Sequence, residues 1–210
     1  MALGASLALS SCVAVRGSGK KAEETRTVPS FSAISLSGGY EIDVESSPGQ
    51  TGEVSLRMSG DDNLLPLVQT NVAAGKLSVD SKEPLWPDLP ITLAAKTGPI
   101  TSLEVSGSGE GRVVGLSGDK VVIDISGSGK LELKGKVKEL LLDVAGSGDI
   151  DAVGVEAEVV TIDIAGSGEA KVCASAKLAV DISGSGKVEY HCDPKEVVQD
   201  IAGSGELVKR

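Results

Sequence analysis

A row of acidic side chains is the feature of this 210-residue sequence with the clearest potential for chemistry. One acidic residue stands three positions before each of six Gly-Ser-Gly triplets, and the members are Glu104, Asp124, Asp143, Asp163, Asp181 and Asp200. Because Ca²⁺ prefers carboxylate and carbonyl oxygens, a stacked row predicts a cation site. The alternative is structural, with each carboxylate accepting hydrogen bonds from turn N–H groups or Ser hydroxyls.

Two cysteines form a second candidate site. Cys173 and Cys192 each stand 11 positions before a triplet, so they occupy equivalent places in consecutive repeats. Equivalent residues on stacked strands lie about 5 Å apart, which a disulfide accepts, and exported proteins meet an oxidising compartment. We therefore predict a disulfide, with two free thiols as the alternative. A cysteine nucleophile is disfavoured because His191, the single histidine, would point to the opposite face of a strand.

The third cysteine indicates a membrane anchor. Residues 1–12 are apolar and uncharged and end in Leu-Ser-Ser-Cys, which looks like a bacterial lipoprotein signal cleaved before the lipid-bearing cysteine. We predict lipid attachment at Cys12, with an ordinary cysteine as the alternative. The segment lacks a basic start and a full-length apolar stretch, which a start codon assigned too late would explain. Residues 13–27 are polar and are predicted to be a tether.

A repeat positions these residues. The triplets recur with gaps of 20, 19, 20, 18 and 19 residues, and they open at Gly107, Gly127, Gly146, Gly166, Gly184 and Gly203. Apolar residues stand four and two positions before each triplet, except that the sixth copy has Gln199, and this alternation is typical of a strand with one buried face. A unit this short cannot hold a strand plus a helix. The sequence therefore predicts an all-β fold, a right-handed, single-stranded parallel β-helix with about 19 residues per coil.

The repeat divides the chain. Residues 100–210 are predicted to form the regular coils, and residues 28–99 a less regular set of β coils that caps one end. Within the cap, the segment 83–90 contains three prolines and Trp86, so we expect a protruding loop. An exposed Trp on a loop is a candidate recognition residue, although packing over the flank of a solenoid is the alternative.

Composition limits the partners. The formal net charge of −10 argues against nucleic acid, whose phosphates need a basic face. No cofactor is expected apart from Ca²⁺ on the acidic row. The strand edge at the end of a β-helix is either capped or paired with another copy, so a homo-oligomer stays open.

The residues also carry a resemblance. The recurring strand, Gly-Ser-Gly and strand, the stretch Tyr40-Glu-Ile-Asp-Val44 and the stretch Gly60-Asp-Asp-Asn-Leu-Leu65 are similar to the head GIN domain family of putative auto-transporter adhesins. The similarity covers roughly residues 28–208. It implies a bacterial β-helix exported on a lipoprotein-type signal, and it brings no catalytic residues.

The expected function is a non-catalytic scaffold of the bacterial cell envelope, anchored to the outer membrane by its lipid and active in adhesion or envelope interactions. A cation- or glycan-binding module that uses the acidic row is the alternative. A polysaccharide-acting enzyme is disfavoured, because the acidic row is periodic and residues 100–210 contain Tyr190 as their single aromatic residue.

Overall fold

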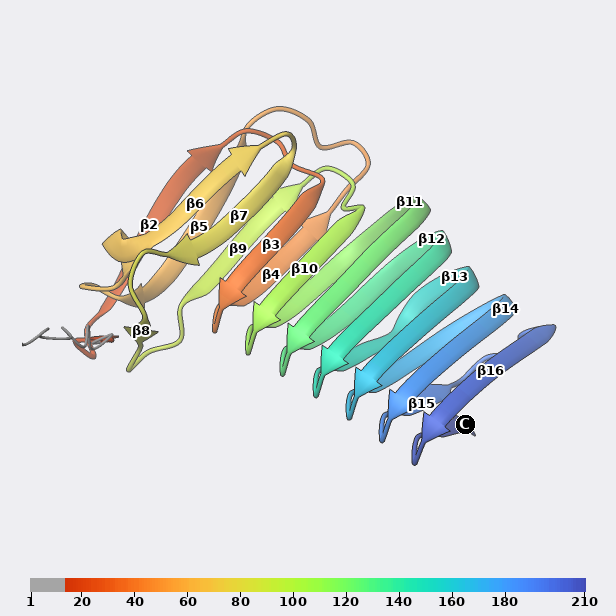
Figure 1. Ribbon diagram of the computed structural model, residues 1–210. Helices are drawn as coiled ribbons and strands as arrows, with labels where there is room; N and C mark the ends of the chain where they lie inside the picture. The colour runs from red at the N-terminus through yellow and green to blue at the C-terminus, as the bar shows by residue number, and fades with distance from the viewer. Residues whose placement is uncertain (1–13) are drawn as a thin grey trace, which may run out of the picture.

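The computed structural model describes residues 14–210, which form an elongated stack of β coils (Figure 1). One 3-10 turn, η1 (Leu65–Leu67), is the helical element among these residues, and none of them forms a helix long and apolar enough to cross a membrane. The strands are β1 (Val15–Arg16), β2 (Lys21–Val28), β3 (Ala33–Gly38), β4 (Glu41–Ser46), β5 (Val54–Asp61), β6 (Val68–Ala73), β7 (Lys76–Ser81), β8 (Leu85–Trp86), β9 (Thr92–Thr97), β10 (Ser102–Gly107), β11 (Glu110–Gly127), β12 (Lys130–Gly146), β13 (Asp149–Gly166), β14 (Glu169–Gly184), β15 (Lys187–Tyr190), β16 (Glu196–Gly203) and β17 (Glu206–Lys209).

The predicted parallel β-helix is confirmed. Strands β10 to β17 pair only in parallel, and each triplet lies directly over the one before it, as in the register Gly107↔Gly127 and Gly127↔Gly146. The long strands β11 to β14 bend around a corner, so each contributes to both faces of the solenoid. On one face β3 and β10 begin the stack, and on the other face β4 does.

The core follows from the alternation. The residues four and two positions before each triplet are buried in five consecutive coils, and they are Leu103, Val105, Ile123, Ile125, Leu142, Val144, Ile162, Ile164, Val180 and Ile182. Small and branched side chains fill the narrow interior between the faces, so few aromatic residues are needed.

The Gly-Ser-Gly triplet makes the tight corner. At Gly166 the backbone has φ +131°, a conformation that only glycine adopts readily, and a Cβ there would overlap the carbonyl oxygen of Gly146. That same oxygen accepts a hydrogen bond from the Ser167 N–H at 2.7 Å. The equivalent bond recurs at the other stacked triplets, at 2.7–2.8 Å. Each corner therefore joins its coil to the one below through the backbone.

The predicted tether over residues 13–27 is wrong for most of its length. Lys21–Val28 forms β2, which pairs antiparallel with β5 over all eight residues. Two of the four inward positions of β2 are charged, at Glu24 and Arg26. The Arg26 guanidinium donates hydrogen bonds to the carbonyl oxygens of Leu65 and Val68 at 3.0 and 2.7 Å. Hydrophobic alternation is absent from this strand, which explains why its sequence looks like a linker.

Candidate functional surfaces

The acidic row is present as a line of carboxylates on consecutive coils. Strand register places its members on consecutive coils, with Glu104 opposite Asp124 and Asp181 opposite Asp200. In the described part of the chain, no three His, Cys, Asp or Glu side chains converge as metal ligands would. The carboxylates follow the solenoid axis one coil apart instead of surrounding a point, and cation binding along the row stays a prediction.

The hydrogen bonds of the structural alternative are not formed between the described residues. Among residues 14–210, no turn N–H or Ser hydroxyl donates a hydrogen bond to these carboxylates. Glu104 is half-exposed and accepts hydrogen bonds from the Lys76 ammonium at 2.6 and 2.7 Å. The row is a solvated acidic stripe that ends at one ion pair.

The other face of the solenoid carries charges of both signs. Two parallel rows stand on it, and their members are Glu110, Lys130, Asp149, Glu169, Lys187 and Glu206 in the first and Arg112, Glu132, Asp151, Lys171 and Glu189 in the second. Ion pairs link the rows to one another and to their neighbours, for example Lys187 with Glu189 at 2.6 Å and Lys134 with Glu132 at 2.6 Å. We call this surface the mixed-charge face.

A shallow trough runs along the mixed-charge face. A stretch of about 490 Å³ lies between the two rows, over the backbone of Ile42, Gly111 and Leu131. A second hollow of about 430 Å³ continues it past Arg112, toward β9 and β5. Gly111 stands where the next coil has Leu131, and this position faces the core: a Cβ on Gly111 would lie 2.8 Å from Leu131 Cδ2 and 2.9 Å from Ile42 Cγ1. The trough is open to solvent and is walled by carboxylates, ammonium groups and a guanidinium, which favours ionic contacts with a polar polymer.

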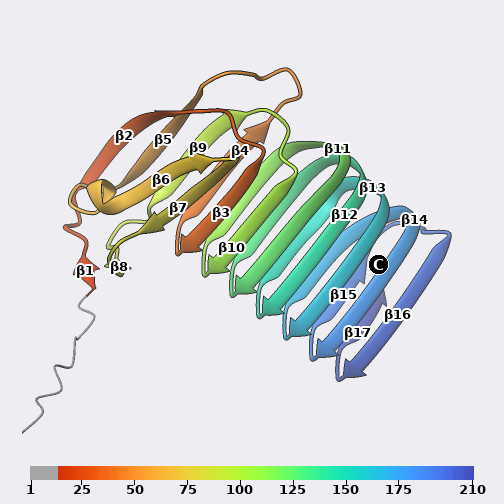
Figure 2. The ribbon, with the colours of Figure 1, turned by 45° about the horizontal axis from the view of Figure 1, so that its top comes forward.

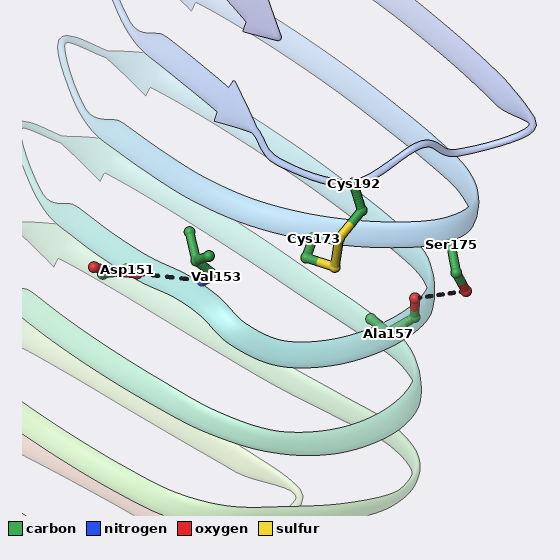
Figure 3. Close-up of a disulfide and its surroundings, with 6 residues drawn as sticks. All are labelled: Asp151, Val153, Ala157, Cys173, Ser175 and Cys192. Atoms are coloured by element: carbon green, nitrogen blue, oxygen red, sulfur yellow. Dashed lines mark hydrogen bonds between the residues drawn. A yellow bond between two sulfur atoms is a disulfide. The ribbon is translucent and has the colours of Figure 1, made fainter. Parts of the chain in front are cut away.

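Cys173 and Cys192 are joined by a disulfide with a Cα–Cα distance of 4.9 Å (Figure 3). Cys173 lies on β14, and Cys192 follows β15 in the next coil. Parallel pairing between these coils lapses after Val172↔Tyr190 and resumes at Lys177↔Glu196. The disulfide therefore links two coils at a corner where strand pairing does not.

Trp86 lies on an exposed loop beside the N-terminal strand. Its side chain is 68% exposed, and it belongs to β8, which pairs with β1 in the register Val15↔Leu85 and Arg16↔Trp86. The Val15 N–H donates to the Pro84 carbonyl at 2.8 Å, and the Gly17 N–H donates to the Trp86 carbonyl at 2.9 Å. Cys12, the predicted lipid site, lies outside the described residues.

A buried carboxylate that sequence reasoning missed holds this arrangement together. Asp61 is fully buried and accepts hydrogen bonds from the backbone N–H groups of Gly19 at 2.6 Å and of Asp88 and Leu89 at 3.0 Å. The Leu89 N–H, helped by the other two, holds the pKa of the Asp61 carboxyl below its usual value. Next to it, the Asn63 amide donates to the Arg16 carbonyl at 2.8 Å. In the sequence, Asp61 stands in a turn-like Gly-Asp-Asp-Asn run, and nothing there signals partners more than 25 residues away.

Comparison with known proteins gives a family match and several similar folds. A family model described as "Putative auto-transporter adhesin, head GIN domain" matches residues 30–194. Among solved structures, a putative adhesin from Bacteroides fragilis is 18% identical, with a TM-score of 0.72 over 93% of this chain and 100% of that chain. A putative adhesin from Parabacteroides distasonis is 24% identical, with a TM-score of 0.59 over 94% and 100% of the two chains. A putative lipid binding protein from the same species is 23% identical, with a TM-score of 0.53 and the same coverage. These likenesses show the shared fold, and no curated protein matches the sequence.

Proposed function

This chain belongs to the putative auto-transporter adhesin family with a head GIN domain, and we propose that it is a non-catalytic adhesion scaffold held at the outer membrane by a lipid on Cys12. The family supports a place in the cell envelope or at the cell surface. The solenoid supplies a rigid frame whose polar side chains recur once per coil.

The observation that carries the proposal is the trough on the mixed-charge face. Its walls carry both signs, with Arg112 and Lys130 beside Glu110 and Glu132. An extended ligand with spaced charges finds a matching partner at successive coils, so many weak ionic contacts add up along its length. An active site instead gathers different groups at one point, and the charged residues of this face are spread along the axis.

The first experiment asks where the protein is and whether Cys12 anchors it. Protease or antibody accessibility on intact cells is expected to show exposed protein, and protection until the outer membrane is breached would overturn the adhesin proposal. Cys12→Ala is expected to release the protein from the membrane fraction.

Adhesion itself is tested with cells that display the full chain. Attachment to a glycan- or protein-coated surface is expected to fall when Arg112→Glu and Lys130→Glu are combined, because both cations lie in the trough wall. Asp163→Lys is the matched control, since it changes a charge on the acidic stripe of the other face. Equal loss in both variants would contradict a role for the trough.

A further inference from the structure

We propose that the proline-rich loop 83–90 is a second membrane contact, with Trp86 seated in the headgroup region of the bilayer beside the anchored N-terminus. The inference rests on the lipid-anchored function proposed above and specifies how the protein meets the membrane. The partner is a lipid surface.

The first step is the length of chain between anchor and fold. Because residues 21–28 are a paired strand and β1 already begins at Val15, two residues and three peptide steps separate Cys12 from the first strand. A chain reaches at most about 3.6 Å per residue, so the Cα of Cys12 lies within roughly 11 Å of that of Val15. Neighbouring strands lie about 4.8 Å apart, which puts the Trp86 backbone beside β1 and close to any lipid on Cys12.

The second step is that the loop is fixed to the N-terminal strand. Asp61 accepts hydrogen bonds from Gly19 on the N-terminal segment and from Asp88 and Leu89 on the loop, so one buried carboxylate ties the two segments together. Three prolines further restrict the loop backbone, which lowers the conformational entropy lost when Trp86 enters the bilayer.

The third step is the chemistry of the exposed surface. Trp86 is the largest exposed apolar side chain among the described residues, and Pro84 and Pro87 on either side of it are also exposed. Indole rings favour the membrane–water interface, where an apolar ring and an N–H donor are both accommodated. A lipid anchor holds more firmly when a second group enters the membrane.

This contact also sets the orientation of the molecule. The loop and β1 lie at the capped end of the solenoid, whereas β16 and β17 lie at the opposite end (Figure 2). A cap fixed at two points to the bilayer directs the coils and their trough away from the membrane. The adhesive surface is then presented at a distance that grows with each coil.

The test uses the only Trp of the sequence as its probe. The full-length lipidated protein is reconstituted into vesicles of phosphatidylethanolamine and phosphatidylglycerol, and its emission is measured with and without lipids brominated near the headgroup. We expect the protein to float with the vesicles, its emission to shift to the blue and most of that emission to be lost on brominated lipid.

A relocated probe gives the matched control. Trp86→Phe combined with Val198→Trp moves the indole to an exposed position on β16 at the far end, and we expect this variant to float without quenching. Flotation of the unaltered protein without quenching, or equal quenching at both positions, would overturn the Trp86 contact while leaving the lipid anchor in place. Failure to float would overturn both the anchor and this inference, and neither result bears on attachment through the trough.

Discussion

Between Ser102 and Lys209 every strand pair is parallel, and the triplets with the strand segments before them meet in the same register from coil to coil. By contrast, three of the pairs made by strands between Lys21 and Thr97 are antiparallel. The repeated coils are held by contacts that recur, namely the stacked apolar positions and the backbone bonds of the triplets. The N-terminal region is held by contacts that occur once, such as those of Asp61 and Arg26. Substitutions should therefore spread their effects along the coils in the first region and act locally in the second.

The strongest test of the recurring contacts is Gly166→Ala. The new Cβ would overlap the Gly146 carbonyl oxygen and force a residue other than glycine into φ +131°. Backbone strain and overpacking together are expected to lower the free energy of unfolding by about 4 kcal/mol, measured by urea unfolding.

Gly118→Ala separates the two causes. Gly118 has φ +127°, but a Cβ there meets nothing within 4 Å. The strain alone is expected to cost about 2 kcal/mol. Equal losses in the two variants would show that close stacking of the triplets contributes nothing.

Removing the disulfide tests a contact in the coils that does not recur. Cys173→Ser with Cys192→Ser opens a link across 19 residues, and we expect a loss of about 3 kcal/mol in the free energy of unfolding. Unaltered protein in reductant should unfold at the same urea concentration as the variant. A midpoint that does not change in either case would assign the stability of this corner to strand pairing alone.

How far the sequence predicts the structure differs between the regions for the same reason. A contact that recurs in every coil produces a regular spacing of residues in the sequence. The solenoid, its register and the stacking of Cys173 with Cys192 could therefore be inferred from the spacing of the triplets. The Asp61 contacts and the polar strand β2 leave no period, because each is a single meeting of residues distant in sequence. The spacing of the acidic row likewise predicts its place on consecutive coils, but spacing alone does not say whether its carboxylates bind a cation.

Asp61→Ala tests the single contacts of the N-terminal region. Three backbone N–H groups would lose their acceptor, so amide exchange at Gly19, Asp88 and Leu89 is expected to be roughly tenfold faster or more. The triplet amides should keep their protection. Asp143→Ala, which removes an exposed carboxylate from the acidic stripe, is the control and is expected to leave exchange at all these positions unchanged.

The smallest effect on stability is expected at Glu189, which belongs to a recurring row of charges but also makes contacts that occur once. Glu189 is a regular member of the second charged row, yet it is only 7% exposed. Its carboxylate accepts a hydrogen bond from the Arg210 guanidinium at 2.8 Å and forms an ion pair with Lys187 at 2.6 Å. The Arg210 guanidinium, followed by the Lys187 ammonium, lowers the pKa of the Glu189 carboxyl from 4.5 to about 2. Because the pKa of Glu189 is lower in the folded protein than in the unfolded chain, the ionised carboxylate stabilises the fold. This stabilisation is complete above the pKa of the unfolded chain, and it is lost as the pH falls from about 4.5 toward 2.

The measurement is the thermal unfolding midpoint as a function of pH. Glu189→Gln is expected to flatten the decline of the midpoint between pH 4.5 and pH 2, since the titrating group is gone. Glu169→Gln is the control. Glu169 lies in the first charged row one coil earlier, its carboxylate is more exposed, and its ion pair with Lys171 is longer, at 3.7 Å. This variant should change the decline of the midpoint less than Glu189→Gln does. If the two variants behave alike, then Glu189 acts as one more solvated charge of the repeat and its burial between coils has no consequence for stability.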